Sequence, residues 1–189
     1  MDALITSLLL AVIAGFGDRA QLFVAAMSVR FGATWRIYAA IAGASLLNCF
    51  IAAYCGALVS QWISVDAVLL FYALSLLFAA GGMLFFRPRV DALQGWRTGA
   101  FLTCWFGLLV LQFGDKGQFI IAATAARTHD PLLAALGGWI GTLAAFLPAA
   151  MLGERTGQIL PVRAIRLGGG AALLIVGLVV ALRAWGILD

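Results

Sequence analysis

Six apolar runs make up most of this chain of 189 residues, and each is about as long as a lipid bilayer requires. A transmembrane helix needs roughly 20 consecutive apolar residues. Hydrophobic residues account for 64% of the chain and charged residues for only 11%, whereas soluble domains are about half apolar and about a quarter charged. Lipid has to solvate this surplus of apolar side chains. We therefore predict an all-α integral membrane protein with no room for a separate soluble domain.

The expected transmembrane helices lie between stretches that carry charge, glycine or proline, at residues 4–29, 36–61, 65–86, 97–126, 132–152 and 164–186. Basic residues are distributed unevenly between these helices. Only Arg127 and Arg183 flank the even-numbered connections or the C-terminus, whereas the odd-numbered connections are flanked by Arg30, Arg36, Arg87, Arg89, Arg97, Arg155, Arg163 and Arg166. Cytoplasmic loops are enriched in Lys and Arg. We therefore expect the odd-numbered connections in the cytoplasm and both termini outside it.

One short motif, Phe-Gly-Asp-basic-x-Gln, occurs twice, at residues 16–21 and 113–118. The two copies lie 97 residues apart, and the same spacing pairs Ser45 with Thr142. A unit of three helices crosses the membrane an odd number of times, so its second copy must enter from the opposite side. The sequence thus predicts six transmembrane helices in two inverted three-helix repeats. The predicted parts are a first repeat at 1–86, a cytoplasmic linker at 87–96 and a second repeat at 97–189.

The aspartate of each motif copy falls deep inside an apolar run. Asp18 and Asp115 would lie at hydrocarbon depth, where a charged side chain costs at least about 2.5 to 3.5 kcal/mol. A purely structural ion-pair network is one explanation. Sequence neighbours on a helix do not face one another, so such a network would need the crossed pairs of Asp18 with Lys116 and Asp115 with Arg19. The alternative is a functional site, which we favour because structural carboxylates are rare at this depth.

As a functional site, the two carboxylates would form an oxygen-rich cation site together with the amide oxygens of Gln21, Gln118 and Gln112. Hard divalent ions such as Ca²⁺ and Mn²⁺ prefer these ligands. The glycines beside the carboxylates would let the helices unwind and offer backbone carbonyls, or let them pack closely; they are Gly15, Gly17, Gly114 and Gly117. Because metal and proton compete for a carboxylate, such a site could exchange one for the other.

These residues resemble the Golgi-type calcium/manganese:proton antiporter family, also described as uncharacterised protein family sixteen. Its mark is two copies of E-x-G-D-(K/R)-(S/T) followed by Gln. The resemblance extends over nearly the whole chain and includes the runs at 44–48 and 165–169. It implies a six-helix secondary transporter of two inverted repeats that moves Mn²⁺ or Ca²⁺ against protons. By position, it implies that Asp18 and Asp115 are ion ligands, with Gln21 and Gln118 beside them.

The chain departs from the family pattern at four positions. Gly15 and Gln112 replace the two glutamates, and Ala20 and Gly117 replace the two hydroxyl residues. The two remaining negative charges are opposed by Arg19 and Lys116. We therefore expect weaker binding of divalent ions than a site of four carboxylates would give.

Two other functions use the same scaffold. With fewer acidic ligands, the chain could export another small solute, or it could be a degenerate membrane subunit that transports nothing. An enzyme is disfavoured because the single histidine, His129, lies in an outer loop. For the intramembrane polar residues Ser45, Asn48 and Thr142, we expect interhelical hydrogen bonds before ion contacts.

The expected partners are the divalent cation, protons and the lipid bilayer. We expect no cofactor beyond the transported ion. Basic residues lie between apolar runs instead of covering one face, which argues against a nucleic-acid partner. The short loops suit a bacterial inner membrane, and the sequence leaves a homo-oligomer open.

Overall fold

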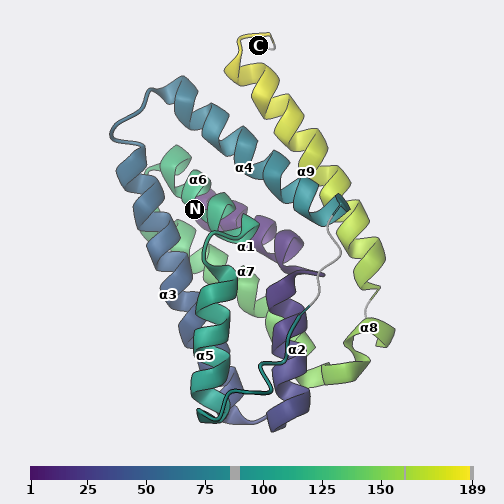
Figure 1. The fold of residues 1–189 in the computed structure, drawn as a ribbon. Coiled ribbons are helices and arrows are strands. Elements are labelled where there is room, and N and C mark those ends of the chain that lie inside the picture. The colour runs from purple at the N-terminus through teal and green to yellow at the C-terminus, as the bar shows by residue number, and fades with distance from the viewer. Residues whose placement is uncertain (86–89, 160, 188–189) are drawn as a thin grey trace.

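The computed structural model describes residues 1–85, 90–159 and 161–187, and within these ranges the chain forms helices and no strand (Figure 1). The prediction of an all-α protein is confirmed. The helices are α1 (Asp2–Gly15), α2 (Arg19–Phe31), α3 (Trp35–Val59), α4 (Val65–Phe85), α5 (Gly99–Gln112), α6 (Lys116–Thr128), α7 (Pro131–Leu152), α8 (Thr156–Ile159) and α9 (Val162–Ala184), with a 3₁₀ turn at Gly153–Arg155.

Four helical segments are long and apolar enough to cross a membrane: α3, α4, α9 and the stretch Pro131–Ile159, in which α8 continues from α7. The pair α1 and α2, bent by 66°, makes a fifth if it forms one span. At 1.5 Å per residue, the 14-residue α5 is about 21 Å long, less than the roughly 30 Å of a hydrocarbon core. The described residues therefore contain four to five candidate spans, whereas the sequence predicted six.

The difference arises because the helices expected at 4–29 and 97–126 are both broken at the repeated motif. Helix α1 ends at Gly15 and α2 begins at Arg19, and the break between α5 and α6 is of the same length. Gly17 and Gly114 both have a φ of +71°, a conformation that glycine adopts without steric cost. The next residue in each copy, Asp18 or Asp115, is the N-cap of the following helix. The motif thus carries both the stop and the start of a helix.

The helix boundaries recur at the spacing of the motif. Helices α1 and α2 begin and end 97 residues before α5 and α6 do, and α4 begins 97 residues before α9. Two stretches of different sequence therefore encode the same order of helix, break and helix.

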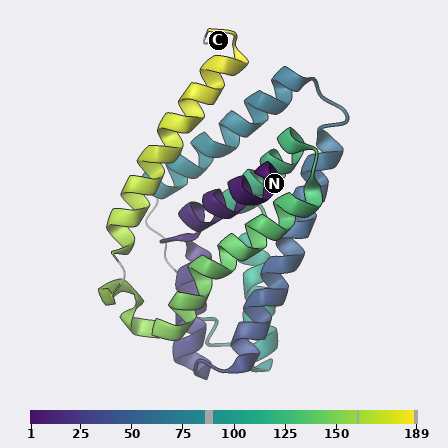
Figure 2. The ribbon, with the colours of Figure 1, turned by 180° about the vertical axis from the view of Figure 1, so that it is seen from behind.

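Helix α1 packs along α7, while α4 and α9 run side by side at one edge of the molecule (Figure 2). The first helix break, with Gly17 and Asp18 buried, lies between buried apolar clusters formed mainly by α2, α3, α5 and α7 on one side and by α1, α4 and α6 on the other. In the second break, Phe113 and Gly114 are exposed. Helix α9 leaves apolar side chains such as Ile175 and Leu178 exposed, as expected for a helix that faces lipid. The first break is thus shielded and the second is partly exposed, while the outer helices present apolar surface.

The connection between the two halves is held to the end of α2. The Arg30 guanidinium donates hydrogen bonds to the carbonyls of Ala92 at 3.0 Å and Trp96 at 2.7 Å. These contacts fix the second part of the linker expected at 87–96. Arg87 and Arg89, which the charge pattern assigned to the cytoplasm, lie outside the described residues, as does residue 86 at the end of the expected third helix.

Replacing Gly137 by alanine is expected to destabilise the contact between α1 and α7. A Cβ atom at Gly137 would lie 2.2 Å from the Leu4 carbonyl oxygen, and backbone atoms cannot move aside cheaply. Overpacking costs about 1 to 3 kcal/mol, which lowers the melting temperature of a chain of this size by about 2 to 12 °C. Thermal unfolding in detergent measures this. Gly168→Ala is the control, because a Cβ atom there meets nothing within 4 Å; equal melting temperatures would contradict the described packing.

Candidate functional site

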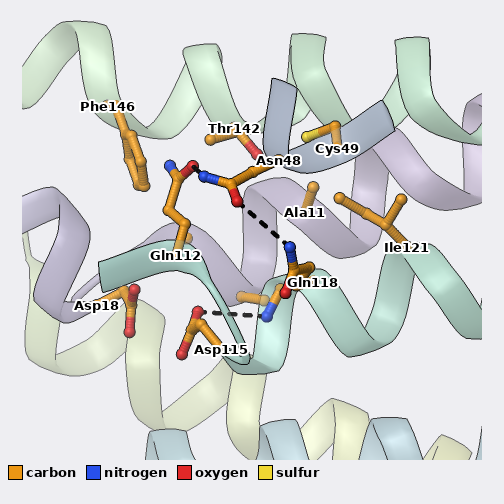
Figure 3. Close-up of a pocket in the computed structure, with 13 residues that line it drawn as sticks. Ala11, Asp18, Asn48, Cys49, Gln112, Asp115, Gln118, Ile121, Thr142 and Phe146 are labelled. Atoms are coloured by element: carbon orange, nitrogen blue, oxygen red, sulfur yellow. Dashed lines mark hydrogen bonds between the residues drawn. The ribbon is translucent and has the colours of Figure 1, made fainter. Parts of the chain in front are cut away.

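Asp18 and Asp115 line the same internal cavity, which has a volume of about 40 Å³ (Figure 3). One water needs at least about 10 to 15 Å³ of such volume, so the cavity has room for a dehydrated cation. Each aspartate caps a helix, since Asp18 accepts a hydrogen bond from the Ala20 amide and Asp115 from the Gly117 amide, both at 3.3 Å. The two breaks thus bring carboxylates from both halves of the chain to one cavity.

Lys116 forms ion pairs with both carboxylates. Its ammonium contacts Asp18 closely and lies 4.0 Å from Asp115 Oδ1, and its side chain is only 8% exposed. The crossed pair of Asp18 with Lys116 is therefore present. The expectation that Asp115 and Lys116 do not face one another is wrong, because Asp115 precedes the helix with extended backbone angles, φ −79° and ψ 161°.

A chain of hydrogen-bonded amides runs from the second break to α3. The Gly114 amide donates to Gln118 Oε1 at 2.7 Å, and Gln118 Nε2 donates to Asn48 Oδ1 at 3.3 Å. Asn48 Nδ2 in turn donates to Gln112 Oε1 at 3.1 Å, and Gln112 Nε2 donates to Ser45 Oγ at 3.0 Å. Figure 3 shows Gln118, Asn48 and Gln112 linked beside the two aspartates.

This chain contains the interhelical hydrogen bonds that the sequence predicted for Ser45 and Asn48. The amide oxygens of Gln112, Gln118 and Asn48 each accept one hydrogen bond, so each keeps a second lone pair for a cation. Thr142 lines the same cavity from α7.

Gln21 does not line this cavity, although it matches Gln118 in the repeat. Its side chain is fully buried; Oε1 accepts from the Gly17 amide and Nε2 donates to the Ala145 carbonyl, both at 2.8 Å. Gln21 thus fastens the first break to α7, whereas Gln118 reaches a polar side chain on α3.

The two halves differ because α1 packs closely on α7. Ala145 stands 97 residues after Asn48, and Gly15 stands 97 residues before Gln112, so the first break has no equivalent of the polar side chains of Asn48 and Gln112 beside it. A Cβ atom at Gly15 would lie only 2.8 Å from Ala145 Cβ. Of the two roles considered for the glycines, Gly15 serves close packing, while Gly17 and Gly114 allow the helix breaks.

The part of the chain that the structure describes holds no cluster of three or more His, Cys, Asp or Glu side chains. A divalent ion in the cavity would therefore be held by two carboxylates together with neutral oxygens. Sequence reasoning missed several cavity-lining residues, including Ala11, Ile121 and Phe146. Nothing in the sequence distinguishes these apolar side chains from others in the same helices.

Comparisons with known proteins agree with this arrangement. The family described as divalent cation/proton antiporter GDT1 matches residues 3–92 and 100–187. A protein of Vibrio cholerae serotype O1 named "Putative manganese exporter" is 28% identical over 168 residues, which cover 88% of this chain and 84% of the relative. No solved structure matches the chain significantly. Both matches indicate a transporter rather than an enzyme. Since the family match spans nearly the whole chain, this multi-pass membrane protein belongs to the divalent cation/proton antiporter GDT1 family.

Proposed function

We propose that this chain exports a divalent cation, Mn²⁺ or Ca²⁺, in exchange for protons, and that Asp18 and Asp115 bind the ion. The observation that carries this proposal is that both carboxylates cap helices at breaks in the chain and line one cavity with amide oxygens. The name of the Vibrio cholerae relative favours Mn²⁺. Gln112, Gln118 and Asn48 would complete the ligand set, and Gln21 would hold the first break in place.

We infer six spans in two inverted repeats, residues 1–86 and 97–189 joined by a linker at 87–96. Counting each broken pair, α1–α2 and α5–α6, as one span gives six. The recurrence of helix boundaries at a spacing of 97 residues supports this arrangement, as does the family match, whose two stretches begin 97 residues apart. The distribution of arginines supports cytoplasmic odd-numbered connections and outward termini, and short loops favour a bacterial inner membrane.

Exchange follows from competition for the same oxygen atoms. A carboxylate must be deprotonated to bind a metal ion, so metal binding releases protons and protonation releases the metal. If the cavity opens to each side of the membrane in turn, a proton gradient then drives the cation in the opposite direction. Helix breaks near the bilayer midplane are typical of secondary transporters that work in this way.

The test is a flux assay with the full chain in liposomes under an imposed pH gradient. We expect Mn²⁺ to move in the direction opposite to the protons, and faster than in protein-free liposomes. The internal pH should change to match. Ca²⁺ in place of Mn²⁺ distinguishes the two ions, and a panel of small organic solutes tests for another cargo. Fluxes of Mn²⁺ and Ca²⁺ equal to those of protein-free liposomes, with folded protein present, would contradict the proposal.

A further inference from the structure

The buried ammonium of Lys116 contacts the two carboxylates that are proposed to bind the ion. It is within ion-pair distance of Asp18 and Asp115, whose side chains also line the internal cavity. Lys116 itself does not line that cavity. The ammonium therefore contacts the carboxylates without forming part of the cavity wall.

A second hollow, an open groove of about 630 Å³, begins on the Lys116 side of the carboxylates. Asp18, Asp115 and Lys116 line it together with Arg19 and with Gly81 and Gly82 of α4. The rest of its lining is Gly114 and the apolar side chains of Phe78, Phe85, Val110, Leu111 and Phe113. A Cβ atom at Gly82 would lie 3.4 Å from Lys116 Cδ, and one at Gly81 would meet nothing within 4 Å. The missing side chains at these two glycines leave the lysine stem space to move away from the carboxylates.

We propose that Lys116 is a tethered counter-cation that competes with the divalent ion. It neutralises Asp18 and Asp115 between transport events and withdraws into the groove when the ion binds from the cavity side. This inference rests on the proposed function, because it identifies Lys116 as the group that competes with the transported ion for Asp18 and Asp115.

Charge balance gives the physical reason. Two carboxylates supply two negative charges, which a divalent ion balances alone, so an ammonium beside the bound ion would be repelled in a poorly hydrated site. With the ion gone, the ammonium prevents two like charges from facing each other unbalanced. Lys116 thereby weakens cation binding and speeds release, which a transporter needs in each cycle.

The basic residue after the motif aspartate is buried only in the second copy of the motif. Arg19 occupies the equivalent position of the first half, but its side chain is exposed, whereas Lys116 is 6% exposed. Arg183→Met is the control for Lys116→Met, since it also removes one positive charge, at an exposed position in the last turn of α9 that lines neither the cavity nor the groove. Lys116→Arg keeps the charge at the site.

The first experiment measures Mn²⁺ binding to the detergent-solubilised full chain and Mn²⁺ exchange in liposomes. We expect Lys116→Met to bind Mn²⁺ at least tenfold more tightly than the parent and to exchange it more slowly. Lys116→Arg should stay within about threefold of the parent affinity, and Arg183→Met should not bind more tightly. Folded Lys116→Met that binds Mn²⁺ no more tightly than the parent would overturn the inference.

The second experiment needs no variant, because Lys116 is the only lysine of the chain. An amine-reactive reagent is applied with and without saturating Mn²⁺, and mass spectrometry follows modification of the peptide that contains Lys116. Withdrawal of the ammonium into the open groove predicts at least threefold faster modification when Mn²⁺ is bound. If the unsubstituted chain binds Mn²⁺ but its modification is unchanged, this inference alone is overturned. If the unsubstituted chain neither binds nor transports Mn²⁺ or Ca²⁺, the proposed function is overturned as well.

Discussion

Replacing Asp18 by asparagine is expected to lower Mn²⁺ affinity and proton-coupled exchange by about 30-fold or more while leaving the chain folded. Asparagine caps helices as well as aspartate does, so the hydrogen bond to the Ala20 amide and the start of α2 should persist. The site loses one of its two negative charges and Lys116 loses its closer partner. Loss of one partner from a buried charged pair costs about 2 to 5 kcal/mol in binding, and every 1.4 kcal/mol is about tenfold in affinity.

Liposome flux and Mn²⁺ titration of the same preparation measure this effect, and Asp130→Asn provides the control. Asp130 is also an N-cap, with Oδ1 accepting a hydrogen bond from the Leu133 amide at 3.1 Å, but it lies at the start of α7, away from the cavity. The same substitution there removes a capping charge and should leave exchange at the parent rate. Parent-like exchange by Asp18→Asn would exclude this carboxylate from the ion site.

The sequence was sufficient to predict the membrane class and the positions of the unbroken helices. The helix expected at 36–61 extends over Trp35–Val59, and that expected at 132–152 extends over Pro131–Leu152. Hydrophobic periodicity and length define such segments well. These sequence signals do not resolve a break of three residues inside an apolar run, because the average hydropathy of the run hardly changes. The glycine before each motif aspartate was the local signal for the break.

The candidate site was predictable to the extent that it follows the repeat. Matching motifs in matching helices indicated that Asp18 and Asp115 belong together, and both line one cavity. The different environments of Gln21 and Gln118 were not predictable from the motif, which is the same in both copies. They depend on distant packing partners, the Ala145 carbonyl in one case and the Asn48 side chain in the other.

The family pattern has glutamate where this chain has Gly15 and Gln112. Introducing glutamate at these two positions should have opposite effects. Gln112→Glu is expected to tighten Mn²⁺ binding about tenfold, equivalent to about 1.4 kcal/mol. A glutamate there can accept the hydrogen bond from Asn48 as Gln112 does, and the Ser45 hydroxyl can rotate to donate instead of accepting. The substitution therefore adds a third negative charge beside the cavity without new steric conflict.

Gly15→Glu is expected to destabilise the protein before it can assist binding, since its Cβ atom would lie 2.8 Å from Ala145 Cβ in the contact between α1 and α7. Thermal unfolding with and without Mn²⁺ separates the two outcomes. Gln112→Glu should gain more stability from Mn²⁺ than the parent does, because tighter binding to the folded state raises its melting temperature. Gly15→Glu should melt lower under both conditions.

Parent-like stability of Gly15→Glu would contradict the described helix contact. If the parent transports no ion and Gln112→Glu gains transport, the result would favour a degenerate subunit.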